Sequence, residues 1–170
     1  MTTAEIAGTP IAAFDVDRHR ATVHRELAKR SFLTLATVSA AQRPHVAGVL
    51  YVEVDGALYL NVHDTSIKAR NIRENPRVAV CIPVRKVPVG PPYVIHFQGT
   101  AELLPADDPG IAALIDAGRL KPILTNGVLD DPHSCFVRIS PGRTVTTFGI
   151  GVSLLKVIRE PLQAMRTVDW

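Results

Sequence analysis

The sequence lacks any long hydrophobic run. Hydrophobic residues make up 46% of the 170-residue chain, yet no apolar stretch approaches the ~20 residues that a helix needs to cross a bilayer. Residues 1–20 also lack the basic segment leading into an apolar one that marks a secretory signal. The mean hydropathy of +0.15 argues against a disordered chain. We therefore expect a soluble, cytoplasmic protein without a membrane partner.

Cysteine and aromatic residues are scarce. Cys81 and Cys135 are far apart, and neither has a CxxC partner, so the pattern favours two buried free thiols over a disulfide or a zinc site. Aromatic residues make up 5% of the chain, the net charge is +3, and the basic residues are not interleaved with aromatics. This distribution gives nucleic-acid binding little support.

Several motifs of catalysis and metal binding are missing. The GIG at residues 149–151 lacks the third glycine of GxGxxG and no βαβ unit surrounds it. There is no GxSxG motif, no P-loop and no pair of carboxylates placed for hydrolysis. The histidines near the predicted strands show no spacing that assembles a compact ligand set locally, so we predict no metal site; they are His45, His63, His96 and His133.

What the sequence does contain is a change of hydrophobic period. Residues 15–30 suit a helix, whereas 31–39, 44–54 and 57–63 are rich in β-branched and aromatic residues. Asp55-Gly56 predicts a hairpin between the last two segments. Neither face of these strands is cleanly polar, which suits a closed or half-closed barrel better than a sheet with one wet face.

The rest of the chain continues this pattern. A short helix at 66–75 should stop before Pro76, and Gly99 should mark a bulge or a close backbone approach. A proline-rich loop at 85–92 separates two of the later elements. Further strands are expected at 77–84, 93–104, 134–140 and 144–148, and a second helix at about 107–118. The sequence thus predicts a single, mainly β domain over residues 1–170, with a core at about 15–148 and residues 149–170 left unassigned.

The start of the helix at 66–75 is the strongest candidate site. The first N–H groups of a helix are unpaired, and its N-terminus carries partial positive charge. Lys68 adds a full positive charge to this first turn, which is unfavourable unless an anion binds there. Ser66 could cap the helix, or it could offer its hydroxyl and N–H to a phosphate. On these residues alone, a capped surface helix and a phosphate site both remain open.

These segments resemble, in order and spacing, the flavin-binding split-barrel superfamily of pyridoxamine-phosphate-oxidase-like proteins and flavin/deazaflavin oxidoreductases. The matching parts are residues 32–62, Ser66-x-Lys68-x-x-Asn71, NPRVAV at 75–80 and FQGTAEL at 97–103. The resemblance implies a six-stranded antiparallel split β-barrel that forms a homodimer with its cofactor at the subunit interface. It implies that Lys68 and Ser66 hold the cofactor phosphate. The cofactor-binding residues that it implies are His45, Val46, Ala47, Gly48, Asn61, Val62, His63, Ser66, Ile67 and Lys68.

The resemblance also implies an oxidoreductase that transfers a hydride to or from a small organic substrate. FMN is the expected cofactor, with the deazaflavin coenzyme F-420 or FAD as alternatives, and His63 or His45 is the candidate for proton transfer. Ile67 stands where authentic pyridoxamine-phosphate oxidases have a second basic residue, so we do not expect vitamin B6 oxidation. Two alternatives remain: a non-catalytic flavin- or haem-binding module, and a metal-dependent barrel enzyme using His45, His63 and His96.

Overall fold

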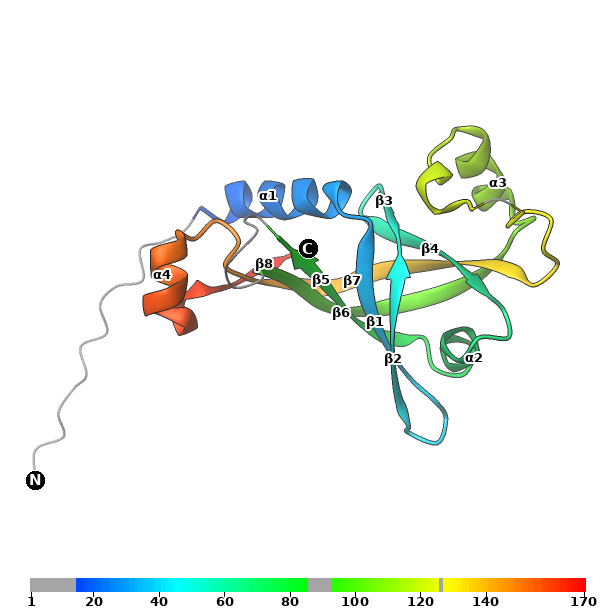
Figure 1. Cartoon of the computed structure of the whole chain (residues 1–170), viewed down its shortest axis with the longest axis horizontal. Helices are drawn as coiled ribbons and strands as arrows, with labels where there is room; N and C mark the ends of the chain where they lie inside the picture. The colour runs from blue at the N-terminus through cyan, green and yellow to red at the C-terminus, as the bar shows by residue number, and fades with distance from the viewer. Residues whose placement is uncertain (1–14, 86–92, 126) are drawn as a thin grey trace, which may run out of the picture.

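The structure is a computed structural model, and it describes residues 15–85, 93–125 and 127–170. It confirms the predicted mainly β fold, in which one curled antiparallel sheet forms a half-barrel with helices around it (Figure 1). The hydrogen-bonded order is β2-β1-β5-β6-β7-β4-β3, and β8 pairs with β7. The strands are β1 (Phe32–Val38), β2 (Pro44–Leu50), β3 (Val52–Val54), β4 (Ala57–His63), β5 (Arg77–Val84), β6 (Tyr93–Pro105), β7 (Ser134–Phe148) and β8 (Met165–Asp169). The helices are α1 (Val16–Lys29), α2 (Ile67–Glu74), α3 (Pro109–Asp116) and α4 (Leu154–Arg159), with 3-10 turns η1 (Lys121–Ile123) and η2 (Pro161–Ala164).

The predicted strand at 44–54 divides at Tyr51. β2 pairs with β1, whereas β3 pairs with β4, so the chain changes partners at this residue. The Tyr51 side chain is buried, and its hydroxyl donates a hydrogen bond of 2.8 Å to the carbonyl oxygen of Leu27 near the end of α1. The hairpin at Asp55-Gly56 is confirmed, since both residues have positive φ (51° and 84°), as a type I′ turn requires.

The prediction for Gly99 is also confirmed. Phe97 of β6 pairs with Val145, but Gly99 pairs with Pro141, so residues 142–144 of β7 lie opposite the single residue Gln98. A Cβ at Gly99 would overlap the backbone carbonyl oxygen of Ser140. This bulge accommodates the Pro-Gly-Arg segment within a continuous β7, which corrects the prediction of two separate strands at 134–140 and 144–148.

Residues 149–170 complete the sheet and fasten the C-terminus. β8 pairs with the last part of β7, and the amide of Gly149 donates to the carbonyl oxygen of Ala164. Trp170 stacks on His24 of α1, with ring centroids 4.0 Å apart. The tail is therefore part of the domain. No helix of the described residues is long and apolar enough to cross a membrane, and residues 86–92 of the expected proline-rich loop lie outside the described part.

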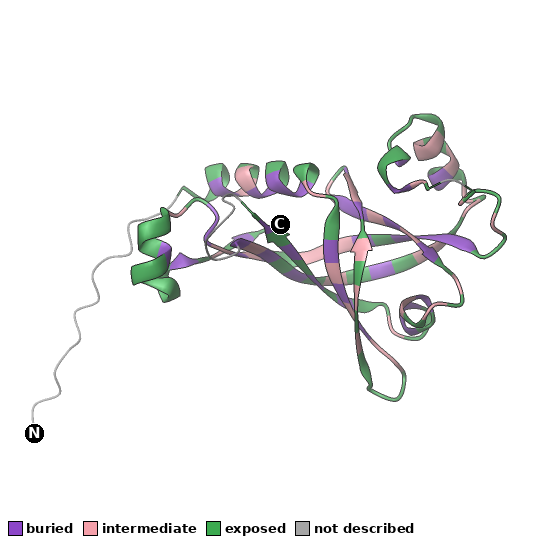
Figure 2. Ribbon diagram, in the orientation of Figure 1, coloured by how far each residue is buried: buried purple, intermediate pink, exposed green. Residues whose placement is uncertain are grey.

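Two hydrophobic clusters hold the fold together (Figure 2). The main core lies between α1 and the strands; its fully buried members include Leu27, Leu33, Leu35, Leu58, Leu60, Ile82, Ile95 and Ile139. A smaller cluster packs α3 and η1 against the sheet, with Ile111, Leu120 and Phe136 at its centre. Because β1 and β5 carry their buried residues at alternate positions, the other face of these two strands remains outside both clusters.

The two cysteines lie in different environments. Both are free thiols, as predicted, and Cys135 is buried. Cys81 is exposed, which corrects the prediction that both thiols are buried. Burial alternates along β5, so the neighbours Val80 and Ile82 point into the core and Cys81 points away from it. After Arg77 every residue of this strand is apolar, so the sequence does not show which face is buried.

Candidate functional site

The candidate phosphate site is the start of α2, where Ser66 is the N-cap. The Ser66 hydroxyl accepts a hydrogen bond from the amide of Ala69, and the Ser66 amide donates to the carbonyl oxygen of His63. The amides of Ile67 and Lys68 have no acceptor within the described part of the chain. Ser66 therefore caps the helix, and the two backbone N–H groups of Ile67 and Lys68 remain available to an external acceptor such as a phosphate.

Lys68 is the cation nearest to these donors in the sequence. The first turn of α2 contains no acidic residue, and the half-buried Lys68 side chain has no hydrogen bond or ion pair among the described residues. A positive side chain at the positive end of a helix dipole is unfavourable by itself. The charge and the two free amides together form a donor set that fits a phosphate group.

The strands with the other predicted residues adjoin this helix start. β4 ends at His63, three residues before Ser66, and β2 contacts both β4 and α2 because the sheet curls. The structure therefore brings His45–Gly48, Asn61–His63 and Ser66–Lys68 onto three adjoining elements. β2 is also at one end of the hydrogen-bonded strand order, so one edge of its backbone pairs with no strand of the described sheet. That edge leaves main-chain groups near Ala47 and Gly48 for a ligand.

The polar side chains of this region differ in how fully they are paired. The Asn61 amide donates 2.9 Å to the hydroxyl of Ser134 and is thereby committed to β7. Asn71 is buried and donates 3.0 Å to the hydroxyl of Thr37, which ties α2 to β1. His45 is half-buried, and its Nδ1 atom is buried without a hydrogen-bond partner in the described residues. His45 therefore retains a free donor or acceptor beside the candidate site.

Cys135 lies close to the start of α2 but does not supply a nucleophile. Burial raises the pKa of its thiol, the Asp64 carboxylate raises this pKa further, and Arg73 and Lys68 oppose that effect. The thiol also donates to the carbonyl oxygen of Val62. A neutral, buried thiol is a structural group, because the thiolate is the reactive form.

The structure does not assemble the metal-ligand set of the alternative hypothesis. His96 lies on β6 opposite Cys81 and Thr146, on the exposed face of the sheet, whereas His45 lies on the edge strand β2. Among the described residues, the potential metal ligands that lie together are instead His63, Asp64 and His133. Local spacing in the sequence does not predict this group, because His133 is 69 residues from Asp64. The sequence does contain a hint of this group. Asp131 and His133 lie just before β7, and His63 and Asp64 lie at the end of β4.

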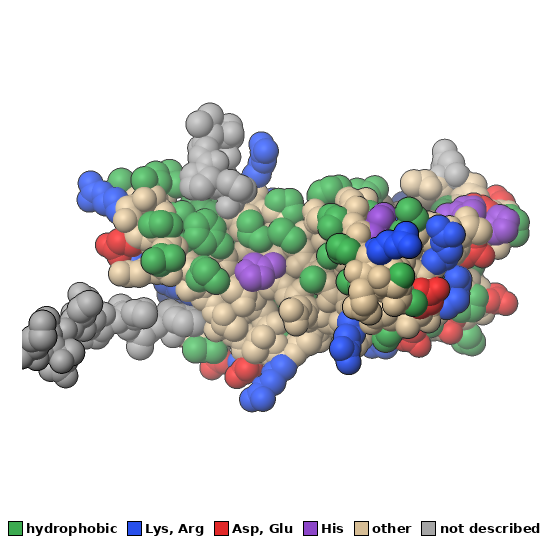
Figure 3. Space-filling view, turned by 90° about the horizontal axis from the view of Figure 1, so that it is seen from below, with side chains coloured by type: hydrophobic (Ala, Val, Ile, Leu, Met, Phe, Trp, Pro, Cys, Tyr) green, Lys and Arg blue, Asp and Glu red, His purple; other side chains and the backbone are tan. Residues whose placement is uncertain are grey.

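An open groove of about 890 Å³ follows the exposed face of β1, β5, β6 and β7. Its lining is mostly small or uncharged and includes Thr34, Ala79, Cys81, His96 and Thr146. A second groove shares residues with it and reaches Pro44, next to His45. On the side of the molecule away from α1, hydrophobic and uncharged side chains cover the middle, and most charged ones lie towards the ends and rim (Figure 3). The second groove ends at Pro44, and the predicted cofactor-binding residues do not line either groove.

Comparison with known proteins assigns the family. Residues 20–120 match the model of the pyridoxamine 5'-phosphate oxidase family. Because this match covers more than half of the 170 residues, the chain belongs to the pyridoxamine 5'-phosphate oxidase-like split-barrel family. No match was found among curated proteins.

Solved structures show the same fold at low sequence identity. The haem storage protein HutZ from Vibrio cholerae has a TM-score of 0.64 and 18% identity, over 76% of this chain and 94% of that one. An FAD-binding protein from Mesorhizobium loti has a TM-score of 0.62 and 23% identity, over 75% and 90%. An F420 reductase has a TM-score of 0.54 and 23% identity, over 70% and 92%. Similarity at this level establishes the shared split-barrel fold.

Proposed function

We propose that the protein is a flavin- or deazaflavin-dependent oxidoreductase that transfers a hydride to or from a small organic substrate. Family membership supports a cofactor of this class, and similar folds occur in proteins described as an F420 reductase and an FAD-binding protein. The observation that carries the proposal is the start of α2, where the amides of Ile67 and Lys68 and the Lys68 ammonium group lack partners in the described residues. When bound, the ring system supplies the redox chemistry, and the protein supplies position and electrostatics.

Phosphate binding is the first role of these residues. Two amides and one ammonium group can each donate to a phosphate oxygen, and hydrogen bonds to a charged group contribute about 1.5–3 kcal/mol each. FMN is our first choice because the site provides one phosphate anchor. Coenzyme F-420 also carries a phosphate and remains the principal alternative, followed by FAD.

Binding of the ring is assigned to the two strands that adjoin α2. Backbone groups near Ala47, Gly48 and Val62 would hydrogen-bond the ring, and the absence of a side chain at Gly48 makes room for the ring of Phe32 beside this strand. A Cβ at Gly48 would lie 2.7 Å from the Phe32 ring. His45, with its unpaired Nδ1, and His63 are the candidates for holding or moving a proton.

The proposed assembly is a cytoplasmic homodimer with the cofactor at the subunit interface. The uncharged face along β1, β5, β6 and β7 is the surface through which a second copy would pack. Its second groove ends near His45, so a partner copy on this face would close over the candidate cofactor site. The mass of the protein in solution, measured by light scattering, tests this part independently of cofactor binding.

Substitution of Lys68 tests the phosphate assignment. Lys68→Ala should weaken FMN binding by about 1–3 kcal/mol, or about 5- to 150-fold in Kd, as measured by quenching of flavin fluorescence. The matched control is Arg70→Ala, which removes an exposed cation two residues further along the same helix and should leave Kd unchanged. Equal Kd values for Lys68→Ala and the unsubstituted protein would remove Lys68 from the site.

A non-catalytic haem-binding module is the second candidate. One support for it is the exposed His96 in the open groove along β1, β5, β6 and β7, since an accessible imidazole can serve as an axial haem ligand. The other is the fold shared with a haem storage protein. This candidate predicts a shifted haem absorption band on titration with haemin, and loss of that shift in His96→Ala. It also predicts no turnover when reduced flavin or deazaflavin is offered with enones or quinones.

A further inference from the structure

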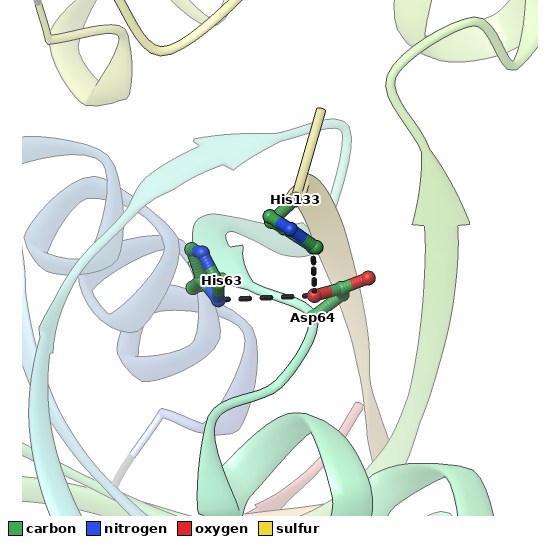
Figure 4. A group of neighbouring side chains, drawn as sticks. All are labelled: His63, Asp64 and His133. Atoms are coloured by element: carbon green, nitrogen blue, oxygen red, sulfur yellow. Dashed lines mark hydrogen bonds and ion pairs between the residues drawn. The ribbon is translucent and has the colours of Figure 1, made fainter. Parts of the chain in front are cut away.

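We propose that His63, Asp64 and His133 form a binding site for a divalent transition-metal ion such as Zn²⁺ or Co²⁺. The three side chains come from the end of β4 and from the segment before β7, and they converge beside the start of α2 (Figure 4). Two imidazoles and one carboxylate are ligand types that zinc prefers, and three protein ligands leave one position for water. The site shares His63 with the proposed cofactor site, whereas Asp64 and His133 are not among the cofactor-binding residues.

The distances between the donor atoms fit a single ion. Nδ1 of His133 is 3.2 Å from Oδ1 of Asp64, and Nδ1 of His63 is 3.7 Å from the same oxygen. One ligand atom from each residue lies within 4.8 Å of the others. Ligands bonded at about 2.0–2.2 Å in a tetrahedral site lie roughly 3.3–3.6 Å apart. Small side-chain adjustments therefore suffice to bring all three onto one ion.

The backbone that carries these ligands is held in place. His63 pairs with Ser134 in the β4–β7 ladder, and the Asp64 amide donates 2.8 Å to the carbonyl oxygen of His133. The amide of His133 in turn donates 2.9 Å to Oδ1 of Asp131. The two segments are thus fixed to each other before an ion binds, which lowers the conformational cost of binding.

Asp131 supplies a second carboxylate on the far side of His63. Its Oδ2 lies 4.0 Å from Nε2 of His63, so with Nδ1 on the ion the Nε2–H group faces Asp131. A ligand histidine commonly donates its second N–H to a carboxylate, which orients the ring and raises its basicity. The Thr65 hydroxyl, 2.7 Å from Nδ1 of His63, competes with the ion for that nitrogen. Thr65 is exposed, so its side chain can turn towards solvent.

The test uses the full chain after treatment with EDTA and dialysis. Titration with Zn²⁺ by calorimetry should give one ion per chain, and Co²⁺ should give a visible absorption band of a histidine- and carboxylate-bound ion. His133→Ala should weaken Zn²⁺ binding at least ~10-fold and abolish the Co²⁺ band. Asp131→Asn should weaken it by about 10- to 100-fold, the usual effect of removing an outer-shell partner.

His96→Ala is the matched control, because it removes an exposed histidine outside the cluster and should bind Zn²⁺ like the unsubstituted chain. Far-ultraviolet circular dichroism verifies that each variant is folded; if His133→Ala is not, His133→Gln is used in its place. Absence of stoichiometric Zn²⁺ binding would overturn the proposal. Equal affinity in the His133 variant and the unsubstituted chain would overturn it as well. FMN titration of the same His133 variant separates this proposal from the cofactor site, which contains no His133.

Discussion

Tyr51 lies between β2 and β3, and its hydroxyl forms a hydrogen bond with the end of α1. The substitution Tyr51→Phe removes this hydrogen bond and keeps the ring. The side chain is 1% exposed, and its hydroxyl donates to the Leu27 carbonyl oxygen at 2.8 Å. That oxygen also accepts from the Arg30 amide at 3.2 Å, so the substitution leaves no unpaired buried acceptor. We therefore expect a cost near the ordinary net value of a hydrogen bond, about 0.5–1.5 kcal/mol in the free energy of unfolding at pH 7.

The effect of Tyr51→Phe should change with pH. Burial raises the pKa of Tyr51 well above its ordinary value, with a further increase from Glu53 and an opposing decrease from Arg30. The unfolded chain therefore loses the phenol proton above pH ~10, while the folded chain retains it. Above that pH the unfolded state binds fewer protons, so the contribution of this group to stability falls with rising pH. At pH 11 the loss amounts to about 1.4 kcal/mol, and the substituted protein avoids it because it has no phenol at this position.

Urea unfolding of both proteins at pH 7 and pH 11, followed by circular dichroism, measures this difference. The substituted protein should be less stable at pH 7 and equally or more stable at pH 11, because the titrations of all other groups cancel in the comparison. A difference that stays the same at both pH values would refute the assigned burial of the phenol. A cost above about 3 kcal/mol at pH 7 would instead show that the ring packing had changed.

Two further substitutions, each compared with a second one, test the core and the bulge. Leu60→Ala, at a fully buried position, should lower the free energy of unfolding in urea by about 2–5 kcal/mol. Leu155→Ala, at a position 67% exposed, should change it by less than ~0.5 kcal/mol. Similar costs for the two substitutions would contradict the assigned core. Gly99→Ala should cost about 1–3 kcal/mol because its methyl group meets the backbone oxygen of Ser140. Gly48→Ala should cost less, since the half-exposed ring of Phe32 can turn aside, and the reverse order would refute the bulge geometry.

The features that the sequence predicts correctly depend on neighbouring residues. The type I′ hairpin follows from Asp55-Gly56, the end of α2 follows from Asn75-Pro76, and the close approach at Gly99 follows from a lone glycine in a strand. The start of α2 was predictable for the same reason, since a hydroxyl N-cap and a basic first turn adjoin in sequence. Local chemistry determines each of these elements.

The features that the sequence does not predict depend on which distant segments of the chain pair with each other. The apolar alternation of residues 44–54 continues through Tyr51, so nothing local indicates that β2 and β3 have different partners. For the same reason the local sequence does not predict the cluster of His63, Asp64 and His133, whose members lie together because β4 pairs with β7. Binding of a cofactor beside this cluster remains a proposal drawn from the donor groups of α2 and from the family.

The proposed function requires that the start of α2 holds the phosphate of a flavin-type cofactor. Parallel titrations of the purified protein with FMN and with riboflavin, followed by ring fluorescence, test it most directly, because the two ligands differ by the phosphate alone. Binding of FMN should be saturable, and riboflavin should bind at least ~10-fold more weakly because it lacks one or more charged hydrogen bonds. Equal affinity for the two ligands, or no saturable binding of FMN and coenzyme F-420, would contradict it.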